Sequence, residues 1–380
     1  MNIRGFTSAS DRRKALEKEL KVDLKNIGSF TLDEAVASTR NCENMIGVAQ
    51  VPIGVAGPLR IGEQDYYIPL ATTEGALVAS VNRGCKAVTL SGGATAGSYR
   101  IGATRGPVFR VKGFQESTAL YLFFQEQFDK LKEIAEKTSH HLTLTKITSR
   151  GIGRYHYGRF VFDTQDAMGL NMATIATDAI VSYVKEKTGI SCIALSGNYC
   201  VDKKPAWQNI VNARGIEVWA EVVLTEKVIT GVLKTSAQKV YDVWLAKCMM
   251  GSAVSGSMAF NAQFSNIVAA LYLATGQDIA HVVEGSLGIT TAEVVGGDLY
   301  ISVYMPDLMV GTVGGGTGLA TQHEALSILG VAGGNHGKNA LRFAEIVGAA
   351  ALAGEISLLS SLEEGSLARA HARLGKGVAI

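Results

Sequence analysis

The sequence predicts an α+β protein with a large helix-rich domain, an inserted ferredoxin-like domain and a small N-terminal helical segment. Three observations predict this architecture. A chain of 380 residues with 47% hydrophobic residues exceeds the usual size of a single core. Residues 107–194 read as strand, helix, strand, strand, helix, strand, which is the split βαβ order. Sequence of similar character lies on both sides, so this unit reads as an insertion. The predicted domains are therefore 1–42, then 43–106 together with 195–380, and 107–194.

The N-terminal segment, 1–42, predicts two short helices. A charged helix is expected near Asp11 to Leu20, and a second near Leu32 to Ser38 with Thr31 as its cap. The chain becomes charged before any apolar run can form, which is not the pattern of a signal peptide.

The first part of the large domain, 43–106, is punctuated by Gly and Pro. "IGVAQVPIGVAGPLRIG" predicts short strands and turns, and "YYIPLATTEGALVASVNRGCKAVTL" predicts a strand that runs into a helix. The Gly-rich "SGGATAG" then marks a break.

The inserted unit is predicted element by element. "PVFRV" is strand-like, Gln115 to Lys137 is helical, and "HLTLTKIT" and "YGRFVFDT" are β-rich runs. Met168 to Lys187 is helical, and "ISCIAL" closes the unit as a strand.

The remainder, 195–380, alternates long Ala/Gly-rich helices with strands. Helices are expected at about Thr235 to Gly276 and Leu341 to Leu362, and strands at "IEVWAEVVL" and "LYISVYM". The most apolar late segment, "FAEIVGAAALAGEISLLSSL", is interrupted by Glu345 and Glu355. That pattern favours a buried helix over a membrane span.

Charge and cysteine usage narrow the function classes. A net charge of +2, with no basic run, argues against a nucleic-acid or membrane-surface partner. Five cysteines without a C-x-x-C pair favour reduced thiols in a cytoplasmic protein. No histidine lies at metal-ligand spacing, so no metal site is predicted.

Several stretches carry chemistry, but each has an ordinary explanation. Lys203 and Lys204 in "SGNYCVDKKPAWQN" could form a solvated turn, and Glu74 could simply complement the dipole in the first turn of a helix. Asp278 ends an apolar helix, where an acid needs a partner, and His371 could be a surface histidine on a basic tail. "MVGTVGGGTGL" lacks the P-loop and dinucleotide spacings, so it could equally be a tight connection.

Six motifs occur in order: "ENMIGVAQVPIGVAGPL", "ATTEGALVASVNRGCKA", "DAMGLNM", "SGNYCVDKKPA", "GQDIAHV" and "GTVGGGT". Together they strongly resemble the class I catalytic domain of 3-hydroxy-3-methylglutaryl-CoA (HMG-CoA) reductase, from about Cys42 to His371. The resemblance implies that two hydrides from a nicotinamide reduce the thioester to mevalonate and release CoA. It also implies at least a homodimer, or a dimer of dimers, with active sites at the interface.

The resemblance assigns four catalytic residues. Lys203 would stabilise the oxyanion formed by hydride attack, and His371 would protonate the departing CoA thiolate. Glu74 would supply a proton to mevaldehyde, and Asp278 would keep the lysine charged and tune that acid.

The same resemblance implies contacts to substrate and cofactor. The HMG portion would be bound by Arg105, Ser196, Asp202, Lys204, Lys247 and Asn266. The CoA phosphates would meet Asn82, Arg83 and Lys86, whose alternative is a solvated helix face. The nicotinamide cofactor would lie on the inserted domain, at Ser139, His140, Asp166, Met168, Gly169 and Asn171, with Gly314 and Gly315 allowing close backbone approach.

One departure bears on the cofactor. Family members that prefer NADPH typically carry Ser-Arg where this chain has Ser139-His140. A histidine cannot grip a 2′-phosphate bidentately, so NADPH is expected while NADH is not excluded. This leaves open an NAD-dependent relative that works oxidatively in mevalonate degradation. A non-catalytic CoA-ester-binding protein is the other alternative, although a binder would not need all four catalytic residues.

Overall fold

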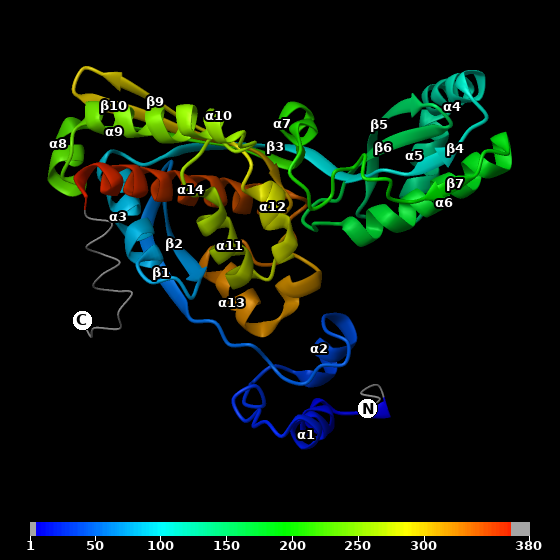
Figure 1. Cartoon of the computed structure of the whole chain (residues 1–380), viewed down its shortest axis with the longest axis horizontal. Coiled ribbons are helices and arrows are strands. Elements are labelled where there is room, and N and C mark those ends of the chain that lie inside the picture. The colour runs from blue at the N-terminus through cyan, green and yellow to red at the C-terminus, as the bar shows by residue number, and fades with distance from the viewer. Residues whose placement is uncertain (1–4, 366–380) are drawn as a thin grey trace.

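The computed structural model describes residues 5–365, and its fold combines helices and strands as the sequence predicted. Figure 1 shows a large body, a smaller lobe to its right, and an N-terminal segment that lies below the body. The described residues contain a two-stranded sheet, β1-β2, and an eight-stranded sheet. The larger sheet runs β7-β4-β6-β3-β8-β10-β9, with β5 paired to β6.

The N-terminal segment holds two helices, α1 (Ala9–Leu20) and α2 (Glu34–Arg40). Each is capped by a side chain, since Ser8 accepts the N–H of Asp11 and Asp33 accepts that of Val36. The prediction of Thr31 as the second cap was therefore wrong. Asp33 lies directly before the helix and adds a negative charge at its positive end.

The hairpin of β1 (Ile53–Ile61) and β2 (Gln64–Ala71) leads into α3 (Leu77–Leu90), as predicted. Glu74, however, is not in the first turn of this helix. It lies in the preceding turn, where its N–H donates to Thr72 Oγ1, and α3 begins only after Ala76. Glu74 therefore does not complement the dipole of this helix from within its first turn.

Four antiparallel strands form the sheet of the large body: β3 (Thr95–Arg105), β8 (Arg214–Leu224), β10 (Asp298–Leu308) and β9 (Ile289–Val295), the last of which was not predicted. The long helix α14 (Lys338–Glu364) packs against this sheet and against α3. A Cβ at Gly84 would lie 1.9 Å from the carbonyl oxygen of Ala353, so α3 approaches α14 closely because this position is glycine.

Among the described residues, α14 is the one helix long and apolar enough to cross a membrane. Its most apolar window is 89% buried inside the fold. Glu355, within it, accepts the backbone N–H groups of Ala262 and Gln263 and the hydroxyl of Thr290. The helix therefore forms the centre of the main core, as predicted from its glutamates.

The smaller lobe has its own hydrophobic core and the predicted element order. Its strands pair in the order β7-β4-β6-β5, and β6 also pairs with the end of β3, which joins the lobe to the body (Figure 1). The single helix predicted over Gln115 to Lys137 is in fact two, because the backbone leaves helical geometry at Gln127. The elements are β4 (Val108–Arg110), α4 (Phe114–Glu126), α5 (Phe128–Glu136), β5 (Thr143–Ile152), β6 (Tyr155–Asp163), α6 (Leu170–Thr188) and β7 (Cys192–Ala194).

The helix predicted over Thr235 to Gly276 is also interrupted. Gly256 ends the first part in a left-handed conformation, with φ +68°, and the carboxylate of Glu355 pins the backbone that follows. Short helices make up the remainder: α7 (Trp207–Asn212), α8 (Glu226–Val228), η2 (Ile229–Leu233), α9 (Ala237–Trp244), η3 (Leu245–Gly251), α10 (Ser252–Ser255), α11 (Phe264–Thr275), η4 (Ile279–His281), α12 (Val282–Gly285), η5 (Gly315–Gly318) and α13 (Ala320–Ile328).

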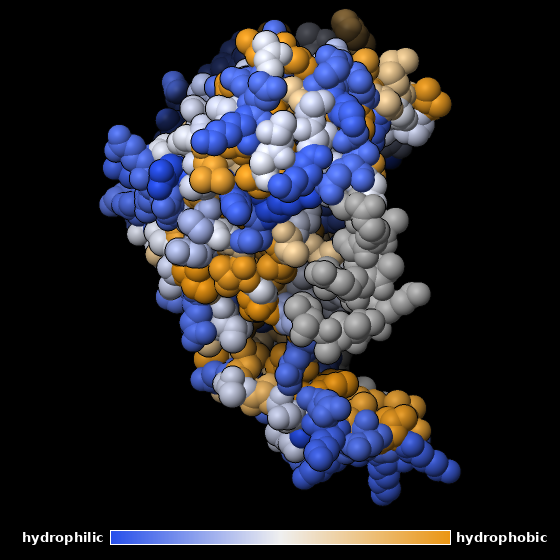
Figure 2. Space-filling view, turned by 90° about the vertical axis from the view of Figure 1, so that its left-hand side faces the viewer, coloured by the Kyte–Doolittle hydropathy of each residue, from blue (hydrophilic) through white to orange (hydrophobic). Residues whose placement is uncertain are grey.

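The N-terminal segment presents apolar residues to its surroundings. Figure 2 shows it as a protrusion below the body with hydrophobic residues on its surface. Leu20, Val22 and Val36 are each more than 40% exposed.

Candidate active site

A cavity of about 780 Å³ lies between the start of α6, the loop that carries Lys203, and the Gly-rich loop after β10. This volume is in the range of small-molecule sites. Nine residues predicted for the site line it: Arg105, Met168, Gly169, Asn171, Asp202, Lys203, Asp278, Gly314 and Gly315. Asn41, from the N-terminal segment, also lines it and was not predicted.

The loop that presents Lys203 has an unusual backbone. Asn198, Val201 and Lys203 all have positive φ, at 63°, 51° and 56°. Residues other than glycine rarely adopt this conformation, because it costs about 1 kcal/mol or more at each residue. It persists only where the surrounding structure holds the backbone in place. Here the N–H of Lys203 donates to Glu284 Oε1 at 3.0 Å, so a buried carboxylate fixes the backbone of this residue.

The ammonium of Lys203 meets the carboxylate of Asp278 at 2.6 Å. Asp278 lies just beyond α11 and caps η4 by accepting the N–H of Ala280. Burial raises the pKa of Asp278, but the bonds from Lys203 and Ala280 and the nearby His281 outweigh it, so the pKa lies below its ordinary value. The acid therefore has the partner that its apolar surroundings require.

Behind Lys203 lies a buried cluster of charged side chains. Its centre is Arg214, which is fully buried and places its guanidinium 2.7 Å from Asp202 and 2.7 Å from Glu284. Burial raises the pKa of Asp202, but Arg214, His281 and Arg105 together bring it below the ordinary value. Asp307 lies 3.8 Å from Arg214, and burial raises its pKa to about 8.

Sequence reasoning missed this cluster: Arg214, His281, Glu284 and Asp307 were not singled out. His281 and Glu284 stand in "GQDIAHVVEG", within one turn of each other and close to Asp278. Three acids or histidines so close together in an apolar segment were the available signal. Arg214 and Asp307 lie on strands far from them in sequence, and nothing local indicated that they meet.

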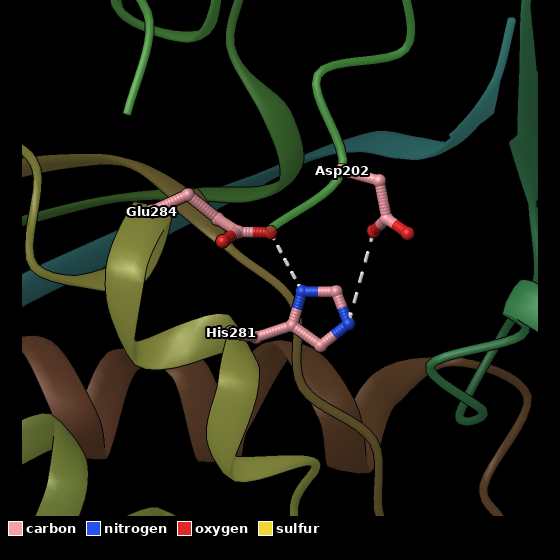
Figure 3. Close-up of side chains that lie close together, drawn as sticks. All are labelled: Asp202, His281 and Glu284. Carbon is pink, nitrogen blue, oxygen red and sulfur yellow. Dashed lines mark hydrogen bonds and ion pairs between the residues drawn. The ribbon is translucent and has the colours of Figure 1, made fainter. Parts of the chain in front are cut away.

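Asp202, His281 and Glu284 bring three possible metal-ligand atoms within 4.8 Å of one another (Figure 3). Their chemistry does not suit a cation, because the Arg214 guanidinium already contacts both carboxylates. Glu284 Oε1 additionally accepts the N–H of Lys203. The group therefore acts as an internal ion network.

The opposite wall has features that suit a nicotinamide dinucleotide. The helix α6 starts at this wall with Gly169 as its N-cap and no capping side chain, so N–H groups at its positive end are available to a phosphate. Gly169 has φ +78°, and a Cβ there would lie 2.3 Å from Thr164. A Cβ at Gly314 or Gly315 would meet nothing within 4 Å, so these residues present bare backbone to the cavity. The residues present fit such a cofactor.

Other predicted cofactor residues have different environments. The carboxylate of Asp166 is buried and accepts the backbone N–H groups of Asn335, Gly337 and Ala340, so it caps the start of α14. It does not line the cavity. Ser139 Oγ lies 3.4 Å from the sulfur of Met172 on the cavity wall, and His140 is exposed beside it.

The predicted substrate residues fall into two groups. Arg105 Nη1 lies 3.5 Å from Asp202 at the cavity, and Lys204 and Ser196 lie on the same loop as Lys203, with exposed side chains. Lys247 and Asn266 do not line this cavity, and neither does Glu74, which was predicted as a catalytic residue. Tyr272 and Leu273 of α11 reach the wall, and Asn266 is seven residues before Leu273, which places these two about 10 Å apart along the helix.

The predicted CoA-phosphate residues do not form one open face. Arg83 turns toward α14, where its guanidinium donates to the carbonyl oxygen of Ser357 and contacts Ser361 and Glu364. Asn82 accepts the N–H of Gly57. Lys86 is exposed. The predicted role of Arg83 at a CoA phosphate stays a prediction, and its guanidinium is held against α14. His371 lies outside the described residues.

Comparison with known proteins identifies relatives of this chain. The family model described as hydroxymethylglutaryl-coenzyme A reductase matches residues 8–376. The chain is 50% identical to the 3-hydroxy-3-methylglutaryl-coenzyme A reductase of Methanocaldococcus jannaschii, over 96% of this chain and 92% of that one. It is also 50% identical to the enzyme of that name from Methanothermobacter thermautotrophicus, over 96% and 93%.

The fold is similar to solved structures of the same name. A class II 3-hydroxy-3-methylglutaryl-CoA reductase from Streptococcus pneumoniae, bound to NADPH in open conformations, superposes with a TM-score of 0.70. The match covers 95% of this chain and 99% of that one at 18% identity. At this identity the likeness bears on the fold alone.

Proposed function

The chain belongs to the hydroxymethylglutaryl-coenzyme A reductase family, and we infer that it reduces HMG-CoA to mevalonate and free CoA with two equivalents of NADPH. It is an oxidoreductase of the mevalonate pathway. The observation that carries this conclusion is the Lys203–Asp278 ion pair of 2.6 Å in a cavity that Gly169, Gly314 and Gly315 also line.

Lys203 is assigned the role of stabilising negative charge. When bound, the nicotinamide supplies hydride to the thioester carbon, and the carbonyl oxygen then becomes an oxyanion. A fixed ammonium beside that oxygen stabilises the oxyanion, and removing such a donor typically costs a factor of about 100 to 1,000 in rate. Asp278 supports this role because its contact keeps the ammonium charged and in place.

Two further proton transfers are assigned from the family motifs. The CoA thiolate leaves more easily when an imidazolium protonates it, and His371 is proposed for this step. Mevaldehyde then accepts a second hydride, and Glu74 is proposed as the acid that protonates its oxygen. Arg105, Asp202 and Lys204 are proposed to hold the carboxylate and hydroxyl of the HMG portion.

We propose that a second copy of the chain completes each site. Glu74, Lys247 and Asn266 do not line the cavity that holds Lys203, although the proposed chemistry needs them together. The exposed apolar residues of the N-terminal segment are also suited to a partner surface (Figure 2). A homodimer, or a dimer of dimers, with shared sites satisfies both observations.

Residues 107–194 are proposed as the nicotinamide domain, with 43–106 and 195–380 as the substrate domain and 1–42 as the N-terminal segment. The class I assignment is supported by the "ATTEG" and "DKKPA" motifs, while the class II structures bear on the fold only. The enzyme is proposed to be cytoplasmic.

The test is the initial rate of NADPH and NADH oxidation, measured in parallel with HMG-CoA as substrate. Faster turnover with NADPH supports the biosynthetic reductase. Preference for NADH, with faster oxidation of mevalonate than reduction of HMG-CoA, would point to mevalonate degradation instead. Absence of turnover with either cofactor would contradict the proposed function.

A further inference from the structure

His281 is a buried histidine surrounded by three carboxylates. Its side chain is 0% exposed, and its Nδ1 lies 2.6 Å from Glu284 Oε1. Its Nε2 faces Asp278 Oδ2 at 3.7 Å and Asp202 Oδ1 at 4.0 Å (Figure 3 shows His281 between Glu284 and Asp202). Within the described residues, Nε2 has no hydrogen-bond partner. A buried imidazole nitrogen aimed at a carboxylate of the site needs an explanation.

The contact with Glu284 determines which ring nitrogen of His281 donates to it. Its Oε1 accepts the N–H of Lys203 at 3.0 Å and contacts Arg214 Nη1 at 2.7 Å, so it behaves as an ionised acceptor. Nδ1 of His281 must then be the donor in their contact, because an ionised carboxylate can only accept. The remaining nitrogen, Nε2, is directed toward Asp278.

Carboxylates hold both the backbone and the ammonium of Lys203. Glu284 holds its backbone, which has φ +56°, and Asp278 holds its ammonium. His281 lies between these two carboxylates and is the one described side chain that contacts Glu284 while also facing Asp278. A change in the position of Asp278 would move the ammonium with it.

We propose that His281 is a positioning residue: held through Nδ1 by Glu284, it uses Nε2 as a donor that orients Asp278 against Lys203. This inference rests on the proposed reductase function. Nε2 faces two carboxylate oxygens, so it fits there as a donor, and with both ring nitrogens donating the side chain is an imidazolium. A shift of about 1 Å would bring it within hydrogen-bond distance of Asp278. That contact would stabilise Asp278 when the substrate oxygen shares the ammonium of Lys203.

Two substitutions separate the two ring nitrogens. His281→Asn places an amide donor where Nδ1 lies and removes the group at Nε2, whereas His281→Gln can place its amide near Nε2. The proposal expects His281→Gln to keep kcat within about threefold of the wild type. His281→Asn should lower kcat about tenfold, the rate equivalent of one hydrogen bond, with the KM for HMG-CoA changed less than twofold. His323→Asn, on the exposed surface of α13, is the matched control.

The measurements are steady-state kcat and KM together with the melting temperature of each variant. Equal kcat for the Asn and Gln variants, or a rise in KM without loss of kcat, would overturn the proposal. If His281→Asn does not fold, the test rests on the folded His281→Gln protein. The proposal requires its kcat to be near that of the wild type, and a larger loss would overturn the proposal. An inactive wild-type enzyme would instead count against the reductase function itself.

Discussion

The carboxylate of Asp278 lies 2.6 Å from the ammonium of Lys203, and both residues line the cavity. Lys203 comes from a loop with three left-handed residues, and Asp278 from the turn that follows α11. The pair is about two-fifths exposed, so it is open to a ligand, while the cluster behind it is buried.

Replacing Lys203 with Met removes the charge and keeps most of the side-chain volume. Because the ammonium is assigned to the oxyanion, kcat should fall by about 100 to 1,000-fold while the melting temperature changes little. Rates of NADPH oxidation and a thermal melt check both parts. Lys227→Met, on exposed α8, is the control and should retain full activity. Turnover of Lys203→Met within threefold of the wild type would remove the assigned role.

Asp307 makes stability depend on pH. Its pKa is raised by burial to about 8, against an ordinary value of 3.8. Between these values the folded state binds more protons than the unfolded state, so the free energy of unfolding should fall as pH rises from about 4 to about 8. Asp307→Asn keeps the shape without the charge, and should raise the melting temperature at pH 8.5 by roughly 3–5 °C but have less effect at pH 5.

Melting curves of the wild type and of Asp307→Asn across this pH range test the point. Asp298→Asn serves as the control, since Asp298 is half-buried at the start of β10, away from Arg214, and its Oδ1 accepts the N–H of Glu226. A pH-independent difference between wild type and Asp307→Asn would show that the carboxyl does not titrate as the buried environment requires.

A shared active site predicts complementation between two inactive chains. Glu74→Gln and Lys203→Met should each be nearly inactive alone. In a mixed dimer one site receives both substitutions and the other receives neither, so co-expression in equal amounts should restore about a quarter of wild-type activity. Activity that stays at the level of the single variants, despite mixed dimers detected by two affinity tags, would place both residues in one chain's site.

The cofactor preference should respond to His140. An arginine can contact a 2′-phosphate with two parallel hydrogen bonds, whereas a histidine cannot. His140→Arg should therefore lower the KM for NADPH about five- to tenfold and leave the KM for NADH unchanged. This fold-change corresponds to a gain of roughly 1–1.4 kcal/mol in the binding free energy of NADPH. His141→Arg, the exposed neighbour, is the control. An equal change for both cofactors would mean that residue 140 does not meet the 2′-phosphate.

The sequence by itself determined the α+β class, most of the elements and the family. Periodicity and turn residues are local properties, so the strands and helices of the small lobe, and a buried helix containing Glu355, were predictable. Long helices were predicted less well. The helix predicted over Gln115 to Lys137 is interrupted at Gln127 by a change in backbone geometry that no glycine or proline signals. The interruption after Gly256 depends on the buried carboxylate of Glu355, which comes from a distant helix.

Only the tertiary structure decided which side chains meet. Lys203 and Asp278 could be named from motifs, but their contact, and the hold of Glu284 on the Lys203 backbone, depend on loops from different parts of the fold. Arg214 and Asp307 gave no local signal, since a charge inside a strand is indistinguishable in sequence from an exposed one. Burial and pairing are set by chain segments distant in sequence. For this reason the sequence identified the chemistry, whereas the structure identified the network that positions it.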